Sequence, residues 1–131
     1  MSRCLMDTNA LLWSCYAPSR LTAKATAAYL AADELFYSIL SPWEIGLKFS
    51  RGGFRDLNVP ADWEQTMIES LRHEGYKLVP VGIPHCRLIQ DLPFHHKDPF
   101  DRMLIAQALV ENLTVIGSDE IFDAYRVKRV W

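Results

Sequence analysis

Five acidic residues stand where an apolar run of the sequence begins or ends. They are Asp7, Glu44, Asp98, Asp101 and Asp119. Carboxylates that gather at one place repel each other, by about 4 kcal/mol for a pair ~4 Å apart at an effective dielectric of ~20. A cluster of acids must therefore take up protons, spread apart or hold cations. Because all-oxygen ligand sets favour Mg²⁺ or Mn²⁺, such a cluster would suit an ion that polarises a phosphoryl oxygen and activates water.

Each acid also has a structural explanation. Asp7 can be a polar strand end, Glu44 suits the dipole of a helix first turn, and Asp119 can cap the segment "EIFDAY". In "HHKDPFDRMLIAQALV", Asp98 precedes a proline and has the N-cap arrangement, so Asp101 falls at the third helical position. The spacing therefore predicts that Asp98 mainly caps the helix and lies near the site as an auxiliary residue. It predicts a chemical role for Asp101.

The elements that must position these acids follow from the apolar patterning. Strands are expected over residues 3–7, 35–40, 77–81, 113–119 and, near an edge, 125–131. Helices are expected over residues 9–16, 21–33, 42–50, within 59–75, over 83–92 and from 99 onward, with Ser41 and Pro42 as N-cap and first residue of the third. Alternating strands and helices predict a three-layer α/β/α sandwich with a mostly parallel central sheet, formed by residues 1–131 as a single domain.

In such sheets ligands bind beyond the carboxyl ends of the strands. The acids stand at these ends or in the helices that follow them. If the strands are neighbours, acids from distant parts of the chain converge on one cleft. Separate helix-capping roles for four or five acids would not explain such a convergence.

Bulk composition excludes some classes of function. The net charge is −2, from 14 Lys and Arg against 16 Asp and Glu, so no broad basic surface is expected, and nucleic acid would have to be held locally. Lys48, Arg51 and Arg102 are the candidates for phosphate contacts. The three cysteines form no metal or disulfide pattern, and no apolar run reaches ~18 residues, which indicates a cytoplasmic protein that does not span a membrane.

Four motifs in order resemble the PIN-domain family, and within it the VapC-type ribonuclease toxins of toxin-antitoxin pairs. They are "LMDTNALLW", "SPWEIGLKFSRGGF", "LPFHHKDPFDRMLIAQA" and "VIGSDEIFDAY". The resemblance implies that four acids hold Mg²⁺ or Mn²⁺ for hydrolysis of RNA phosphodiester bonds, and that the protein has an antitoxin partner and commonly forms a homodimer. By motif position the four acids are Asp7, Glu44, Asp101 and Asp119.

This chain departs from many members of that family at two positions near the acids. Asn9 stands where many relatives carry histidine, and Gly117 stands where many carry threonine. Asn9 can still donate a hydrogen bond to a carboxylate, whereas Gly117 has no hydroxyl to offer. Asn9 and Ser118 are expected to orient the metal ligands through hydrogen bonds.

Two other classes of function stay open at this point. A Mg²⁺-dependent phosphotransfer domain would use the same kind of cleft, but the expected Asp-x-Asp pair reads Asp7-Thr8-Asn9 here. A catalytically silent interaction module would keep the fold without the chemistry, and retention of all four acids argues against it. His95 and His96 are expected to serve the loop rather than a metal, because adjacent residues rarely face one site.

Overall fold

A five-stranded sheet forms the centre of the computed structural model, which describes all 131 residues. The strands are β1 (Arg3–Met6), β2 (Glu34–Ser38), β3 (Lys77–Val79), β4 (Thr114–Ile116) and β5 (Arg129–Val130). Every pair of neighbours is parallel, and the order across the sheet is β3-β2-β1-β4-β5. The chain thus builds one half of the sheet on each side of β1. The predicted α/β/α class is confirmed.

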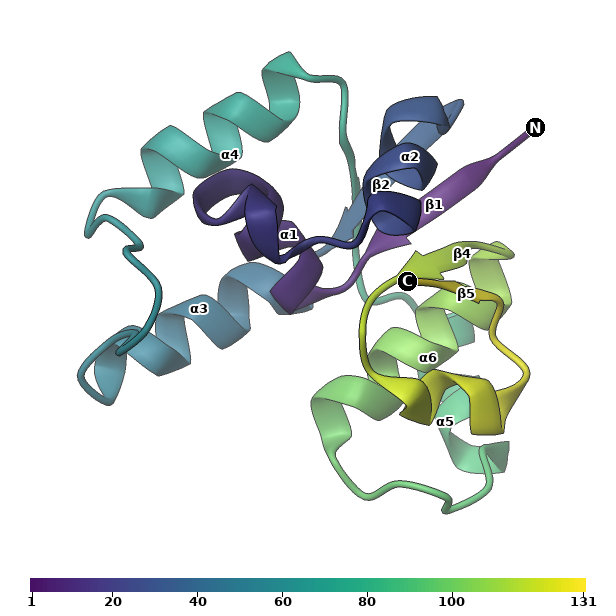
Figure 1. Cartoon of the computed structure of the whole chain (residues 1–131). Helices are drawn as coiled ribbons and strands as arrows, with labels where there is room; N and C mark the ends of the chain where they lie inside the picture. Colours follow the sequence, from purple (N-terminus) through teal and green to yellow (C-terminus); the bar gives the residue numbers. More distant parts are fainter.

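Helices cover both faces of this sheet (Figure 1). They are α1 (Thr8–Tyr16), α2 (Ala23–Ala31), α3 (Leu40–Ser50), α4 (Trp63–His73), α5 (Ile83–Asp91) and α6 (Pro99–Glu111), with the 3-10 helices η1 (Pro18–Arg20) and η2 (Glu120–Tyr125). In Figure 1, α1, α2 and α4 lie on one side of the strands and α5 and α6 on the other, while α3 extends away from the sheet. The helices predicted from the sequence are all present.

Alternation along β1 divides the core into two halves. Cys4 and Met6 face the half that contains buried residues of α1, α2 and α4. Leu5 faces the other half, which contains Ile105 of α6 and Phe122 of η2. Successive side chains of a strand point to opposite faces, so a strand that is apolar throughout is buried on both sides. This places β1 at the centre of the molecule and its carboxyl end between two layers of helices.

Helix α6 is anchored in the molecule by a buried glutamine. The Ser38 hydroxyl donates to Gln107 Oε1 at 2.6 Å, and Gln107 Nε2 donates to the carbonyls of Val79 (3.3 Å) and Pro80 (3.2 Å). Gln107 and Ser38 are both fully buried, so each polar group needs the partner it finds. The network joins α6 to the carboxyl ends of β2 and β3.

The start of α3 differs from the prediction. The helix begins at Leu40 rather than Pro42, and the residue before it, Ile39, offers no side-chain cap. Strand β2 ends at Ser38, whose hydroxyl accepts a hydrogen bond from the Leu40 amide (3.0 Å). Pro42 still lies in the first turn, where its missing N–H costs no helical hydrogen bond. The prediction that Ser41 is the N-cap is therefore wrong, and Ser41 is buried inside the first turn instead.

The last strand is shorter than predicted. Helix η2 extends to Tyr125, and Arg126 adopts a left-handed backbone conformation with φ 62° that ends it. Only Arg129 and Val130 then pair with β4, although their edge position is as predicted.

Candidate functional site

Four of the predicted acids line one small cavity at the carboxyl end of β1. The cavity has a volume of about 60 Å³, and its lining residues are Asp7, Thr8, Asn9, Glu44, Asp101, Leu104, Asp119 and Phe122. The acids come from four segments: the end of β1, helix α3, the first turn of α6 and the residue before η2. Tertiary structure therefore brings together side chains that are up to 112 positions apart, since 119 − 7 = 112.

Asp7 is the most buried member of this group, with 7% of its surface exposed. It is the N-cap of α1, and its Oδ1 accepts a hydrogen bond from the Ala10 amide at 2.8 Å. Burial raises the pKa of Asp7 from 3.8 to about 7, because it disfavours the charged carboxylate. The Ala10 amide opposes this shift, while Asp119, Asp101 and Glu44 add to it by repulsion.

Glu44 is held by the hydroxyl of Thr8, which was not predicted to belong to the site. Thr8 Oγ1 donates to Glu44 Oε1 at 2.9 Å, and Thr8 Oγ1 lies 2.9 Å from Ser41 Oγ. A hydroxyl has one hydrogen, so Thr8 donates to Glu44 and accepts from Ser41. Burial raises the pKa of Glu44, the bond from Thr8 opposes the rise, and repulsion from Asp101 increases it. The only sequence signal for Thr8 was its polar side chain between Asp7 and Asn9, and Ser41 had been predicted only as a helix cap.

Asp101 has a histidine partner. His96 Nε2 lies 2.7 Å from Asp101 Oδ2, and both side chains are about one-third exposed, at 31% and 33%. Burial raises the pKa of Asp101 and the bond to His96 opposes the rise, while the neighbouring Asp98 increases it. His95 contacts the Tyr125 ring and His96 contacts Asp101, so the two adjacent histidines do not face one site, as predicted, but the contact of His96 with an acid was not foreseen. The path of the loop, which spacing along the sequence does not reveal, brings this side chain back to the helix.

Two of the acids also have the capping roles considered for them. Asp98 Oδ1 accepts from the Asp101 amide at 3.0 Å and is the N-cap of α6, with Pro99 next to it. Asp98 is exposed and does not line the cavity. Asp119 Oδ1 accepts from the Ile121 amide at 3.0 Å and also lines the cavity. Capping and a place in the cluster are thus compatible for Asp119.

The two residues predicted to orient the metal ligands differ in their placement. Asn9 lines the cavity, whereas Ser118 does not. The role of the neighbouring Gly117 is steric: a Cβ at this position would lie 2.1 Å from Asp7 Oδ2 and 2.6 Å from Asp7 Cγ. Gly117 therefore leaves the space in which the Asp7 carboxylate lies.

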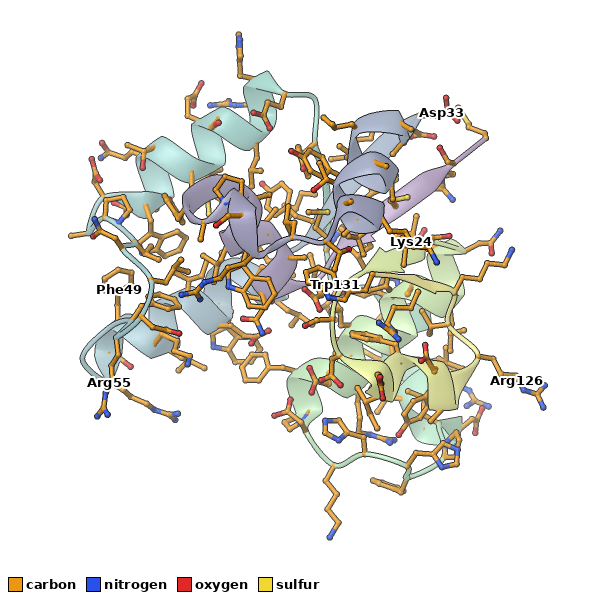
Figure 2. All side chains as sticks on the ribbon, viewed as in Figure 1. Lys24, Asp33, Phe49, Arg55, Arg126 and Trp131 are labelled. Atoms are coloured by element: carbon orange, nitrogen blue, oxygen red, sulfur yellow. The ribbon has the colours of Figure 1, made fainter.

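The basic residues proposed for phosphate contacts also differ. Lys48 is exposed and lines a cavity of about 250 Å³ that shares Thr8, Asn9 and Glu44 with the acid-lined cavity. Arg51 is exposed at the end of α3 and lines neither cavity. Figure 2 shows Arg55 and Arg126 on opposite sides of the molecule.

The prediction for Arg102 is wrong. Arg102 is only 5% exposed, and its guanidinium donates to the carbonyls of Leu92, Pro93 and His96 and to the hydroxyl of Tyr125. A buried guanidinium whose donors are engaged in this way has no free face for a phosphate.

The donor set fits a hard divalent cation in its chemistry. Three of the acids, Asp7, Glu44 and Asp101, have a raised pKa, and a nearby cation would favour their charged forms. As the side chains stand, no group of three His, Cys, Asp or Glu residues is arranged to hold a metal ion. Each acid in the cavity is instead hydrogen-bonded to a donor of the protein.

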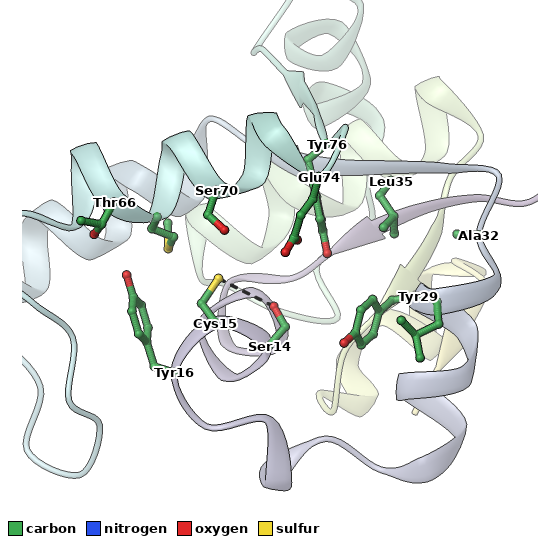
Figure 3. A pocket seen from close by; sticks show the side chains of 12 residues that line it. Ser14, Cys15, Tyr16, Tyr29, Ala32, Leu35, Thr66, Ser70, Glu74 and Tyr76 are labelled. Atoms are coloured by element: carbon green, nitrogen blue, oxygen red, sulfur yellow. Dashed lines mark hydrogen bonds between the residues drawn. The ribbon is translucent and has the colours of Figure 1, made fainter.

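A larger cavity of about 610 Å³ lies between α1, α2 and α4 (Figure 3). Tyr16 and Cys15 of α1 line it together with Tyr29 and Tyr76, and the Tyr16 hydroxyl is buried without a hydrogen-bond partner. Burial raises the pKa of the Cys15 thiol, which disfavours the nucleophilic thiolate. The acid-lined cavity is therefore the candidate for chemistry, although it is smaller.

No helix of the chain has the length and apolar character that a membrane crossing requires. A sequence model of the PIN domain family matches residues 4–128. The chain therefore belongs to the PIN domain family. Comparison with curated protein sequences gives no match.

Several solved structures share the fold over nearly the whole chain. One is VapBC2 from Rickettsia felis bound to a promoter DNA fragment, with TM-score 0.69, 10% identity, and 97% of this chain and 96% of that chain covered. DNA-bound VapBC from Salmonella typhimurium has TM-score 0.68 and 11% identity, with 98% and 97% covered. FitAcB from Neisseria gonorrhoeae has TM-score 0.64 and 18% identity, with 96% and 95% covered.

Proposed function

We propose that this PIN domain is a Mg²⁺- or Mn²⁺-dependent endoribonuclease and the toxin of a toxin-antitoxin pair. The observation that carries the proposal is the single cavity lined by Asp7, Glu44, Asp101 and Asp119. Similar structures of VapBC and FitAB complexes support an antitoxin partner for this chain as well. A homodimer and a cytoplasmic location stay predictions from the sequence, and the free cysteines are compatible with a reducing compartment.

In this proposal Asp7 and Asp101 are the principal metal ligands, and Glu44 and Asp119 complete the site. When bound, the ion would polarise the scissile phosphoryl group and lower the pKa of the attacking water. The protein's own contribution is to hold the acids in place: the Ala10 amide holds Asp7, and Thr8 holds Glu44. Asn9 faces the same cavity as a hydrogen-bond donor to a carboxylate or to substrate.

Substrate contacts would come from few residues. Lys48 lines the cavity that adjoins the acids, so its ammonium can meet a phosphate next to the scissile one. Arg51 is placed one turn further along α3 and could meet a more distant phosphate. Hydrolysis by water would leave 5′-phosphate and 3′-hydroxyl ends.

The direct test is cleavage of a single-stranded RNA by the purified chain with Mn²⁺ or Mg²⁺, with and without chelator. We expect cleavage that chelator abolishes and that Asp7→Asn removes, because Asp7 is the buried ligand at the centre of the cluster. Asp62→Asn, an exposed acid before α4, is the matched control and should cleave as the unmodified chain does. Cleavage that survives chelator, or full activity in Asp7→Asn, would refute the proposal.

The competing functions make different predictions. A phosphotransfer domain would form a phosphoaspartate that hydroxylamine cleaves, which a nuclease does not accumulate. A silent interaction module would bind a partner without any metal-stimulated RNA cleavage. A growth assay separates toxin from non-toxin: expression of the chain alone in bacteria should arrest growth, and expression of Asp7→Asn should not.

A further inference from the structure

The loop between α5 and α6 is organised from inside by Arg102. Its Nη1 donates to the Pro93 carbonyl at 2.8 Å and to the His96 carbonyl at 3.3 Å, and its Nη2 donates to the Leu92 carbonyl at 3.2 Å. The ring of Phe94 covers the guanidinium, with 4.1 Å between Cζ and the ring centroid. A buried cation bonded to three loop carbonyls fixes the loop backbone, because release of any one bond would leave buried charge poorly solvated.

Tyr125 of η2 holds the same loop from the other side. Its hydroxyl accepts a hydrogen bond from the His96 amide at 2.9 Å and lies 3.3 Å from Arg102 Nη1. Tyr125 is 5% exposed, so these bonds are shielded from water. The backbone of His96 is therefore held at both its N–H and its carbonyl, and the starting point of its side chain is fixed.

From this fixed backbone the imidazole of His96 reaches the candidate metal ligand Asp101, with 2.7 Å between Nε2 and Oδ2. We propose that His96 is a positioning residue that orients the Asp101 carboxylate for a divalent cation, and that Arg102 and Tyr125 build the loop that presents it. The inference rests on the proposed function in one respect, the assignment of Asp101 as a ligand. Hydrogen bonds to ligating groups set their orientation, and loss of such a partner typically lowers metal affinity about 10–100-fold.

The test measures Mn²⁺ affinity by calorimetry in the full-length chain, so it does not depend on RNA cleavage. His96→Leu should raise the Kd for Mn²⁺ about tenfold or more, because Asp101 loses its donor. His96→Gln places an amide nitrogen near the position of Nε2 and should keep most of the affinity. His95→Leu is the matched control: the neighbouring histidine is exposed and contacts the Tyr125 ring rather than an acid, so its Kd should not change.

Tyr125→Phe tests the support without a change at the cavity. Loss of its hydroxyl frees the His96 amide, so we expect faster hydrogen exchange at that amide and a higher Kd for Mn²⁺. If His96→Leu fails to fold, this variant and His96→Gln decide the matter. A Kd unchanged in either His96→Leu or Tyr125→Phe overturns the proposal, and so does a loss in His96→Gln as large as that in His96→Leu.

Failure of the proposed function gives a different pattern. If the unmodified chain binds Mn²⁺ but cleaves no RNA, the nuclease assignment fails, and the His96 variants still decide whether His96 positions Asp101. If Asp101→Asn binds Mn²⁺ as well as the unmodified chain, Asp101 is not a ligand, and the proposal for His96 is refuted whether or not the chain cleaves RNA.

Discussion

Asp7 couples its protonation to folding because it is the buried acid of the cluster. In the folded chain its pKa is about 7, against an ordinary value of 3.8, and burial is the main cause. Between these two pH values the folded chain binds more protons than the unfolded chain, so folding stability falls as pH rises from about 4 to about 7. The stability that protonated Asp7 contributes is fully present below pH ~4 and is lost as pH rises through its folded pKa.

Asp7→Asn should remove this dependence, because asparagine keeps the N-cap and carries no charge. With chelator present, the unfolding free energy of the variant minus that of the unmodified chain should be larger at pH 8 than at pH 4.5. We expect this difference to increase by on the order of a few kcal/mol. Urea unfolding at the two pH values measures the difference. Asp62→Asn is the control, and an equal pH dependence in Asp7→Asn and the unmodified chain would contradict the prediction.

Gly117 constrains the same acid through space rather than charge. In Gly117→Ala the new Cβ would meet Asp7 Oδ2 at 2.1 Å, so the carboxylate must leave its bond to the Ala10 amide. We expect weaker Mn²⁺ binding, loss of cleavage and a stability loss of about 1–3 kcal/mol. Gly46→Ala is the control, because nothing lies within 4 Å of a Cβ added at this exposed position of α3, and it should stabilise the helix by about 0.5–1 kcal/mol. Unchanged Mn²⁺ affinity in Gly117→Ala would show that the Asp7 carboxylate moves without consequence.

At the scale of elements, the first turn of α6 separates capping from chemistry. Asp98 caps the helix, and Asp101, three residues later, lines the cavity. Asp98→Ala should lose about 1 kcal/mol of stability through the missing cap and keep metal-dependent cleavage. Asp101→Asn should abolish cleavage and lose little stability. Thermal unfolding and RNA cleavage are measured on both variants. If Asp98→Ala abolished cleavage and Asp101→Asn lost the stability instead, the two roles would be the reverse of those proposed.

Gln107 links α6 to the carboxyl ends of β2 and β3, and α3, which carries Glu44, directly follows β2. Gln107→Leu would leave the carbonyls of Val79 and Pro80 and the hydroxyl of Ser38 without this partner. A buried group left unsatisfied costs about 1–3 kcal/mol, so we expect a loss of at least that size in urea unfolding. Gln90→Leu, an exposed change on α5, should be nearly neutral. A neutral Gln107→Leu would show that water or a backbone shift satisfies the freed groups.

At the scale of the whole molecule, the charge distribution limits how RNA can be held. The net charge is −2, Arg102 is buried, and Lys48 and Arg51 are the two remaining cations of the predicted phosphate contacts. Two phosphate contacts with a single strand predict a slope of about −1.4 for log K against log salt, or about a 25-fold loss of affinity per tenfold rise in salt.

The measurement is binding of single-stranded RNA to the Asp7→Asn variant at several salt concentrations. Lys48→Gln should reduce the slope by about 0.7, because one phosphate contact is lost. Lys24→Gln on α2 is the matched control and should leave the slope unchanged (Figure 2). A slope steeper than about −3 would mean that four or more cations contact phosphate, and the two-contact interpretation would fail.

Several features of the fold depend only on residues that are close together along the chain. The apolar run at β1 and the cap Asp98 depend on residues a few positions apart, so the local sequence predicts them. The parallel sheet follows from the alternation of strands and helices, and it predicted that the acids meet at one edge. Their common cavity agrees with that prediction.

Tertiary structure decided which partner each polar side chain has. Arg102 was predicted from the sequence to be a surface cation. The loop after α5 instead surrounds its guanidinium with carbonyls and with Tyr125, so Arg102 is buried and holds the loop in place. The same loop brings His96 to Asp101, and the early start of α3 turns Ser41 toward Thr8. These contacts join segments through space, and the energy of a buried polar group depends on the partners that surround it rather than on its neighbours in sequence.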